Sequence, residues 1–362
     1  MLIAFDARAW THPPHSFARA LRLLCGAARA MGWQVELWPA GELRAEYEPF
    51  TEWCAVNPAG PSATEAVVLW SPQSYVERCP VPVVSTIHDV NPLLPDGRPG
   101  LTRWLRSHRF RARGRETLER SRWVATDSED ARQRLASEFP ASAERLSVVP
   151  LYADPALCCR DNDERDRRLA EAGLAPGFIL FVGSLRRHKN WAGLMRSYAM
   201  LPPHLRDAHH LVLAGPKHRA ARTALDLAAA LGIADRVHFT GETSEQLLAA
   251  LYGGAMLFSF PSLMEGFGLP PLEAMANRVP VVATDRTSVP EVLGDAAVYV
   301  DPLDVGGLAA AMQDLLEDQA QRERLAGLGT QRVAEFGPER TGLAMQQLLA
   351  HFLPLTADGA TG

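Results

Sequence analysis

Short apolar runs, rich in β-branched and aromatic residues, recur along the chain and are separated by stretches of helical length. Because such residues favour extended backbone, each run predicts a strand. Amphipathic stretches such as residues 18–32 and 245–255 lie between several of them. This alternation is typical of parallel sheets covered on both faces. The predicted strands are LIAFD, WQVELW, AVVLW, PVVSTI, RWVATD and RLSVV in the first half, and FILFVG, HLVLAG, RVHFT, MLFSFP, VPVVAT and AAVYV in the second.

The two series of strands predict an α/β protein of two doubly wound, Rossmann-like domains that face each other across a cleft. The length of 362 residues agrees, because it exceeds what one core of ordinary size holds. We place the first domain at residues 1–155 and the second at 156–336, with the boundary in the charged segment 152–177. Residues 337–362 are predicted to form a helix, beginning near Pro338 and packing back on the first domain, and a tail.

Composition narrows the class of protein. A net charge of −5 and a pI of about 6.1 give no global reason to expect nucleic acid as a partner. The N-terminus shows no secretion signal, and no window reaches the roughly 18 consecutive apolar residues of a membrane span. Five cysteines, of which only Cys158 and Cys159 are close in sequence, fit neither a disulfide framework nor a zinc site. We therefore expect the protein in the cytoplasm.

The segment MEGFGLPPLEAM, residues 264–275, follows the strand predicted at MLFSFP. Ligands of doubly wound sheets bind beyond the carboxyl ends of the strands, so this loop is placed to meet one. Gly266 and Gly268 allow positive φ and a close approach of the backbone to a ligand. Pro270 and Pro271 suit the first turn of a helix, whose N-terminus favours phosphate or electron-rich hydroxyl oxygens.

Two glutamates flank this loop, and each suits a different part of a sugar nucleotide. Glu265, at the strand end, can accept hydrogen bonds from sugar hydroxyls. Glu273, in the first helical turns, is kept ionised by the helix dipole and can bridge a vicinal diol such as ribose. The alternative is structural, with Glu273 complementing the dipole and Glu265 solvated. Both glutamates beside Gly-Phe-Gly and Pro-Pro favour the binding role.

The segment EGFGLPPLEAM resembles the Glu-x7-Glu signature of the retaining, family-4 glycosyltransferases, which have the GT-B fold. FVGSLRRHKNWAGLMRSY resembles that family's first strand and phosphate loop of the C-terminal domain. LVLAGPKH, VHFTGETSEQLLAALYGGA and VPVVATDRTSVPEVLGDAAVYVDPLD follow in the family's order and spacing. The resemblance covers nearly all of residues 178–320 and is specific as a set. It implies a nucleotide-sugar-binding C-terminal domain and an acceptor-binding N-terminal domain.

The resemblance also implies the roles of particular residues. Glu265 and the backbone after it hold the donor sugar, Glu273 holds ribose, and Lys189 meets the diphosphate. Many members have an arginine directly after the strand glycine, where this chain has Ser184, so Arg187 or its neighbour Arg186 is a candidate substitute. The donor-binding set is Ser184, Arg187, Lys189, Glu265, Gly266, Phe267, Gly268, Leu269 and Glu273, and the catalytic set is His88, Lys189 and Glu265. No metal and no cofactor is expected, because Lys189 and helix N-termini stabilise the leaving diphosphate.

The implied reaction is retaining transfer of a hexosyl group from a nucleotide-sugar to a hydroxyl of a glycan, lipid-linked or small-molecule acceptor. EGFGLPPLEAM resembles mannosyl- and rhamnosyl-transferring members, which favours GDP-mannose as donor, with a UDP- or dTDP-sugar next, and polysaccharide biosynthesis as the setting. A sugar-nucleotide-binding scaffold without transfer activity remains an alternative. An NAD-dependent oxidoreductase is less favoured, since neither FDARAW nor FVGSLRRH supplies Gly-x-Gly-x-x-Gly with an acidic residue about 20 positions on.

The first half matches the family more loosely. PVVSTIHDVNPLL resembles the family's strand that ends in a histidine facing the cleft, here His88, and imidazole can bind a sugar hydroxyl or shuttle a proton. The alternative is a histidine held by local backbone. Asp89 is not its partner, because adjacent residues of an extended chain point to opposite sides. The loop with His12 and His15 lacks the family's usual glycine pair, which indicates either an unusual acceptor or looser closure on the donor.

Residues 101–123 carry eight arginines against two acids. Leu101, Trp104, Leu105, His108 and Ala112 fall near one helical face. Such a helix either packs this apolar stripe inward and solvates its charges, which is the commoner arrangement, or docks on an anionic membrane or lipid-linked acceptor. A peripheral contact with the inner face of the membrane is therefore a second hypothesis.

Two short motifs receive structural interpretations. Asp161-Asn162-Asp163 matches the Asp-x-Asp with which a different glycosyltransferase fold binds manganese, but no strand precedes it and we interpret it as a solvated turn. Residues 126–129, Thr-Asp-Ser-Glu, offer a helix capping box, and we assign them that role alone.

Overall fold

The structure, a computed structural model, describes residues 1–6, 16–38, 55–56, 68–71, 81–88, 90, 93, 100–216 and 220–353. The chain divides into two compact units. Unit 1 comprises Met1–Tyr152 together with Phe336–Gly362, and unit 2 comprises Ala153–Glu335. The chain thus passes from unit 1 to unit 2 after residue 152 and returns to unit 1 after residue 335. The boundaries predicted from the sequence lie after residues 155 and 336.

Unit 1 is built on a seven-stranded sheet in the order β3-β2-β1-β4-β5-β6-β7, and every adjacent pair of strands is parallel. Its central strands are fully buried, as near-continuous apolar runs require. The strands are β1 (Leu2–Asp6), β2 (Gln34–Trp38), β3 (Ala55–Val56), β4 (Val68–Ser71), β5 (Val83–Thr86), β6 (Trp123–Thr126) and β7 (Leu146–Val148).

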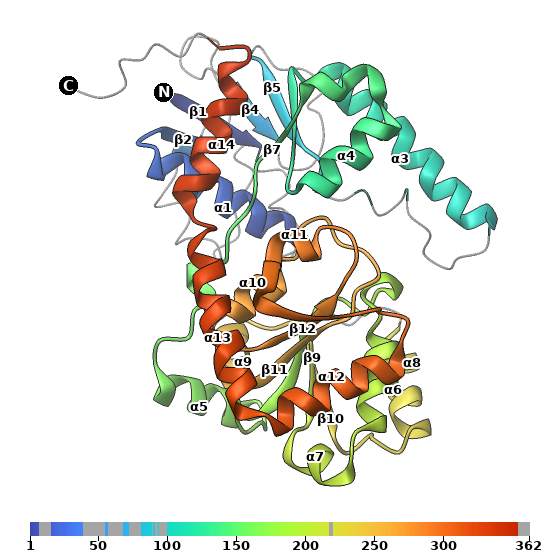
Figure 1. The fold of residues 1–362 in the computed structure, drawn as a ribbon. Helices are drawn as coiled ribbons and strands as arrows, with labels where there is room; N and C mark the ends of the chain where they lie inside the picture. Colours follow the sequence, from blue (N-terminus) through green and yellow to red (C-terminus); the bar gives the residue numbers. More distant parts are fainter. Residues whose placement is uncertain are drawn as a thin grey trace. The chain divides into compact units, whose positions relative to one another are not determined.

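The helices of unit 1 include one that comes from the far end of the chain. α14 lies along α1 (Figure 1), where Gly342 comes so close that a Cβ atom would meet the carbonyl oxygen of Ala27 at 2.9 Å. The Thr341 hydroxyl donates to the carbonyl of Pro150 at 2.7 Å. These contacts explain why the last helix belongs to unit 1. The α-helices are α1 (Ser16–Ala30), α3 (Gly100–Arg120), α4 (Glu129–Glu138) and α14 (Pro338–Ala350).

Unit 2 repeats the same plan with a six-stranded parallel sheet in the order β10-β9-β8-β11-β12-β13, flanked by helices (Figure 1). Its strands are β8 (Phe178–Val182), β9 (Leu211–Ala214), β10 (Val237–Gly241), β11 (Ala255–Phe260), β12 (Val281–Thr284) and β13 (Ala297–Val300). Its α-helices are α5 (Asn162–Glu171), α6 (Trp191–Met200), α7 (Pro203–Ala208), α8 (Ala221–Ala230), α9 (Glu245–Gly254), α10 (Leu269–Ala276), α11 (Val289–Leu293), α12 (Val305–Glu317) and α13 (Gln319–Ala334).

Each sheet has a point at which the strand order changes direction. In unit 1 this point lies between β1 and β4, and in unit 2 between β8 and β11. The loops that leave neighbouring strands there run to opposite sides and open a crevice beyond the carboxyl ends. In unit 2 a ligand is therefore expected at the loops after β8 and β11. The predicted doubly wound architecture and all twelve predicted strands are confirmed, and β3 is an addition.

Candidate functional site

The loops after β8 and β11 meet in unit 2. The amide of Leu263, in the loop after β11, donates to the carbonyl of His188, in the loop after β8, at 2.7 Å. The second loop leads into α10, where Gly268 adopts φ 109° and Pro270 and Pro271 stand in the first helical turn. The positive φ at glycine and the prolines in the first helical turn are thus both present. The N-terminus of α10 lies at the switch point.

Lys189 and Glu265 form a partly buried ion pair at this junction. The Lys189 Nζ atom lies 2.7 Å from Oε1 and 2.8 Å from Oε2 of Glu265. The two side chains are 17% and 9% exposed. Nζ also lies 5.5 Å from the centre of the Phe260 ring, which adds a cation–π contact. The sequence predicted a role for each residue separately, and the structure brings the two together.

The backbone of Glu265 is held by two residues that the sequence analysis did not single out. Its amide donates to Thr287 Oγ1 at 3.1 Å. The hydroxyl of Ser288 lies 3.1 Å from the carbonyl oxygens of both Glu265 and Phe267. Thr287 and Ser288 follow β12, so a third loop supports the first two at the carboxyl edge of the sheet.

Glu273 is fully buried on α10. The hydroxyl of Tyr252, on α9, donates to Glu273 Oε2 at 2.7 Å. Burial raises the pKa of the nearby Cys158 thiol, an effect that Arg160 opposes and the negative charges of Asp154 and Glu273 reinforce. The structure therefore gives Glu273 a structural partner, and its contact with ribose stays a prediction.

The start of the loop after β8 depends on a close backbone contact. Gly215, which follows β9 with φ 143°, lies so near Gly183 that a Cβ atom on it would meet the Gly183 carbonyl oxygen at 2.3 Å. Ser184 follows in the half-exposed part of the loop, and Arg186 and Arg187 are exposed. The side chains of both arginines are thus accessible to an anionic ligand, and their role in holding phosphate stays a prediction.

In unit 1 His88 has a partner far away in sequence. Its Nδ1 atom lies 2.7 Å from Oδ2 of Asp127, and the side chains are 10% and 4% exposed. His88 follows β5 and Asp127 follows β6, so the two meet at the carboxyl edge of adjacent strands. The assignment of residues 126–129 to a capping box alone was wrong. Ser128 caps α4 by accepting from the amide of Ala131 at 3.2 Å, which leaves Asp127 to bind His88.

A second polar pair lies at the switch point of unit 1. The hydroxyl of Ser71, at the end of β4, donates to Asp6 Oδ2, at the end of β1, at 3.1 Å. Both side chains are buried. Predictions about the loop with His12 and His15 and about Asp89 concern positions outside the described residues.

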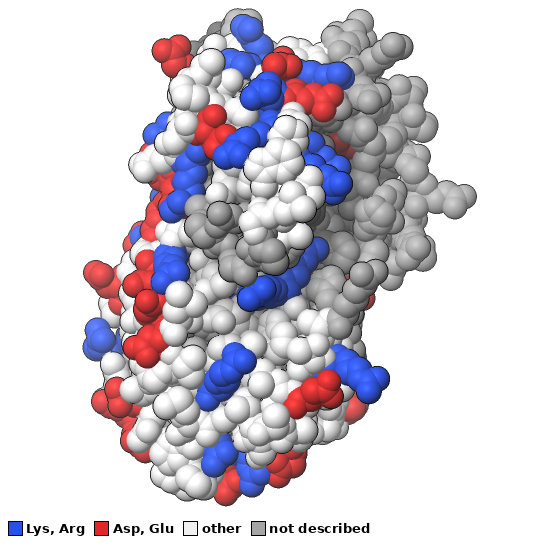
Figure 2. Space-filling model, turned by 90° about the vertical axis from the view of Figure 1, so that its right-hand side faces the viewer, with Lys and Arg blue, Asp and Glu red and all other residues white. Residues whose placement is uncertain are grey.

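Helix α3 carries two apolar stripes, and only one packs inward. Leu118 belongs to a core cluster of unit 1 that includes Phe139, and Phe110 packs against this cluster. The stripe recognised from the sequence faces solvent instead, because Leu101, Trp104 and Leu105 are 70%, 56% and 41% exposed. Figure 2 views the molecule from the side that carries α3, where basic side chains border uncharged surface. Inward packing of this stripe, the commoner arrangement, is therefore not what α3 does.

The Asp-x-Asp motif is a helix cap. Asp161 Oδ1 accepts from the amides of Asp163 and Glu164 at 2.9 and 3.2 Å, at the start of α5. Across the described residues, no group of three or more His, Cys, Asp or Glu side chains is arranged to hold a metal ion. No helix in the described part of the chain combines the length and the apolar character needed to cross a bilayer.

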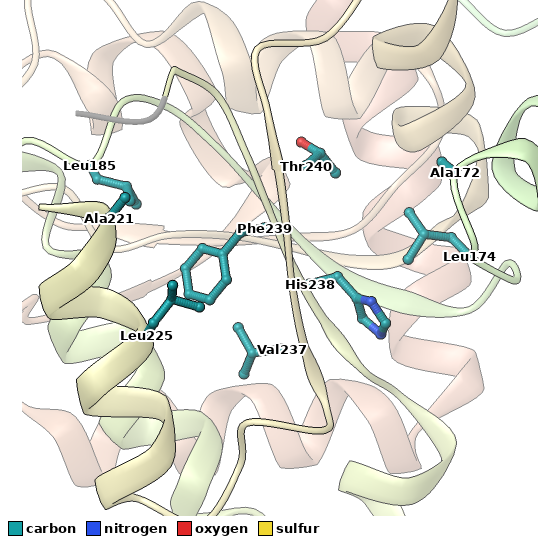
Figure 3. A pocket seen from close by; sticks show the side chains of 9 residues that line it. All are labelled: Ala172, Leu174, Leu185, Ala221, Leu225, Val237, His238, Phe239 and Thr240. Carbon is teal, nitrogen blue, oxygen red and sulfur yellow. The ribbon is translucent and has the colours of Figure 1, made fainter. Parts of the chain in front are cut away.

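A cavity of about 380 Å³ lies against the edge strand β10, and its described lining is mainly apolar. Figure 3 shows Phe239 and Leu225 on one side of the strand and His238 and Leu174 on the other. Burial, followed by the neighbouring His210, lowers the pKa of His238, which favours the neutral ring. Because none of the residues described around it is lysine or arginine, this cavity suits phosphate poorly.

Comparison with known proteins finds glycosyltransferases similar to this chain. Residues 162–332 match the family model described as Glycosyl transferases group 1. O-antigen chain mannosyltransferase B of Escherichia coli is 32% identical over 62% of this chain and 59% of its own length. Serotype-specific mannosyltransferase WbdA of Escherichia coli is 30% identical over 72% of this chain and 32% of its own. This chain therefore spans less than two thirds of either relative.

A solved structure shows the same fold. Anabaena Alr3699/HepE in complex with UDP and glucose is similar with a TM-score of 0.74 over 97% of this chain and 100% of that one, at 18% identity. The predicted GT-B fold is thereby confirmed.

Proposed function

We propose that the chain, which is similar to the glycosyl transferases group 1 over residues 162–332, transfers a hexosyl group from a nucleotide-sugar to a hydroxyl, with retention and without a metal. The observation that carries this proposal is the Lys189–Glu265 pair at the switch point of unit 2. The ammonium is placed for a diphosphate and the carboxylate for sugar hydroxyls, while the N-terminus of α10 adds positive potential. Both charges act in a largely water-excluded site, where they are worth more than in water.

We infer GDP-mannose as the donor and a glycan or lipid-linked hydroxyl as the acceptor. Support comes from the similar proteins named O-antigen chain mannosyltransferase B and mannosyltransferase WbdA. A UDP- or dTDP-sugar is the second candidate. The UDP-sugar is favoured by the similar structure of Anabaena Alr3699/HepE, which was solved in complex with UDP and glucose. In this proposal unit 2 binds the donor and unit 1 the acceptor.

The reaction is tested by incubating the protein with GDP-mannose, UDP-glucose or dTDP-rhamnose in the presence of a chelator. We expect slow release of one nucleoside diphosphate even without an acceptor, and release of a sugar whose first-formed anomer matches the donor by NMR. Release that requires added magnesium would contradict the metal-free mechanism, and inversion at the anomeric carbon would contradict retention. Binding of a nucleotide without any release would favour the scaffold alternative.

His88 is proposed to contact a sugar hydroxyl or to move its proton, and Asp127 to hold the imidazole in one tautomer. A carboxylate at Nδ1 fixes the proton there and leaves Nε2 as the acceptor of a neutral ring. We expect Asp127→Asn to lower turnover about 10-fold or more, as loss of a positioned acid–base group does, with unchanged nucleotide affinity. Asp130→Asn, at the ion pair with Arg134 on α4, is the matched control and is expected to keep turnover. Equal turnover in the two variants would indicate that His88 has only a structural role.

The solvent-facing stripe of α3 is proposed to dock on an anionic lipid surface, at the cytoplasmic face of the membrane. Leu101, Trp104 and Leu105 supply the apolar part. Arg115 lies on the same helical face, because it follows Trp104 by three turns. Exposed Arg109 lies at the edge of this face. This combination of exposed tryptophan and leucine with arginine is typical of helices that lie in the interface plane.

We expect the protein to sediment with phosphatidylglycerol vesicles and to be released by salt. Replacing both Leu101 and Trp104 by serine is expected to lower the partition coefficient at least about 100-fold, since each apolar side chain contributes about 1.5–3 kcal/mol when fully buried. Leu343→Ser, an exposed leucine on α14, is the matched control. An equal loss in the control, or binding to neutral vesicles alone, would contradict a specific role for α3.

A further inference from the structure

Thr287 adopts a backbone conformation that its side chain disfavours. Its φ is 57°, in the left-handed region, where a β-branched residue is a genuine outlier. Glycine would occupy the position without strain. Strain of this kind persists when the surrounding structure demands it, and it concentrates at ligand clamps and active sites.

The hydroxyl of Thr287 makes two hydrogen bonds that a glycine could not make. Thr287 Oγ1 accepts from the amide of Glu265 at 3.1 Å and donates to the carbonyl of Arg286 at 2.7 Å, so both of its hydrogen-bonding roles are used. The buried hydroxyl of Ser288 holds the carbonyls of Glu265 and Phe267 from the same turn. The amide and the carbonyl of Glu265 are therefore fixed by consecutive residues of a loop on the neighbouring strand.

We propose that Thr287 is a positioning residue for the donor loop, and that its strained backbone is retained because the hydroxyl must stand under the amide of Glu265. Lys189 fixes the carboxylate of Glu265 at 2.7 and 2.8 Å, so the clamp of Thr287 and Ser288 completes the alignment from the backbone side. Pre-organisation of this kind lowers the cost of ordering the loop when the donor binds. The inference rests on the proposed function, because the loop is taken to hold the donor.

The test compares Thr287→Gly, which removes both the strain and the hydroxyl, with Thr287→Ser, which keeps the hydroxyl. We expect Thr287→Gly to unfold at an equal or higher denaturant concentration than wild type, yet to lose about 10-fold in kcat/KM for the donor, as misplacement of a binding group does. Thr287→Ser is expected to stay within about twofold of wild type in kcat/KM. Amide hydrogen exchange at Glu265 is expected to be faster in the glycine variant alone.

Arg278→Gly is the matched control, because exposed Arg278 also has a positive φ, 61°, after the end of α10. It is expected to gain stability like Thr287→Gly and to keep full turnover. The inference would be overturned if Thr287→Gly retained kcat/KM, or if Thr287→Ser lost as much. Unchanged exchange at Glu265 would overturn it as well. If wild type turned over no donor, the proposed function would fail, and hydrogen exchange would still decide whether Thr287 holds the loop.

Discussion

We expect Glu265→Gln to lower donor turnover by on the order of 100-fold, while nucleoside diphosphate binds at least as tightly as in wild type. The reason lies in the ion pair. The carboxylate of Glu265 supplies charged acceptors for sugar hydroxyls, which an amide replaces poorly. When no donor is present, the same carboxylate binds the Lys189 ammonium and offsets its positive charge. Its loss therefore leaves the ammonium more available to the diphosphate.

Turnover and calorimetric affinity, measured on the same preparation, separate these effects. Glu317→Gln, an exposed glutamate at the end of α12, is the control for replacing a carboxylate by an amide and is expected to change neither quantity. Wild-type turnover in Glu265→Gln would remove Glu265 from the reaction. Loss of nucleotide binding together with turnover would show that Glu265 supports the phosphate site instead of opposing its positive charge.

Gly215→Ala is expected to lower the free energy of unfolding by about 3 kcal/mol. A methyl group there would meet the Gly183 carbonyl oxygen at 2.3 Å and its carbon at 2.7 Å, far inside van der Waals contact. Both neighbours are backbone atoms, so a rotamer change cannot relieve the clash. Overpacking of this kind costs about 1–3 kcal/mol, and a non-glycine residue in so sparsely populated a backbone region costs about 1–3 kcal/mol more.

Chemical denaturation compares Gly215→Ala with Gly232→Ala, in which an alanine at positive φ meets no clash. Gly232 also has a positive φ, 67°, but a methyl group there would meet no heavy atom within 4 Å. We expect the control to lose only about 1 kcal/mol, the cost of the backbone conformation. Equal losses of unfolding free energy in the two variants would show that the close approach of Gly215 to the Gly183 carbonyl does not limit the side chain at position 215. Because Gly183 begins the loop that carries Lys189, the clash variant is also expected to bind nucleotide more weakly.

The sequence predicted the architecture well, because parallel strands buried on both faces leave long apolar runs. It did not predict β3, whose two residues, Ala55 and Val56, form no run of their own. The Gly-Phe-Gly-Leu-Pro-Pro pattern placed the start of α10 correctly, since proline and glycine restrict the backbone locally.

Pairings between distant residues were beyond the sequence. His88 and Asp127 are 39 positions apart, and only the adjacency of β5 and β6 joins them. The partnership of Glu273 with Tyr252 likewise arises from packing of α9 against α10. Helical periodicity identified the stripe on α3 around Trp104, but periodicity alone does not say whether a face meets protein or solvent.

A nucleoside diphosphate is proposed to bind in unit 2 between Lys189 and the N-terminus of α10. Calorimetric titration of GDP, UDP, dTDP and ADP, each without metal, into wild type and Lys189→Met tests it most directly. We predict that one nucleotide, GDP first, binds wild type tightly and binds Lys189→Met at least about 10-fold more weakly, the loss expected for one charged hydrogen bond. Absence of binding by all four nucleotides, or equal affinity in the two proteins, would contradict it.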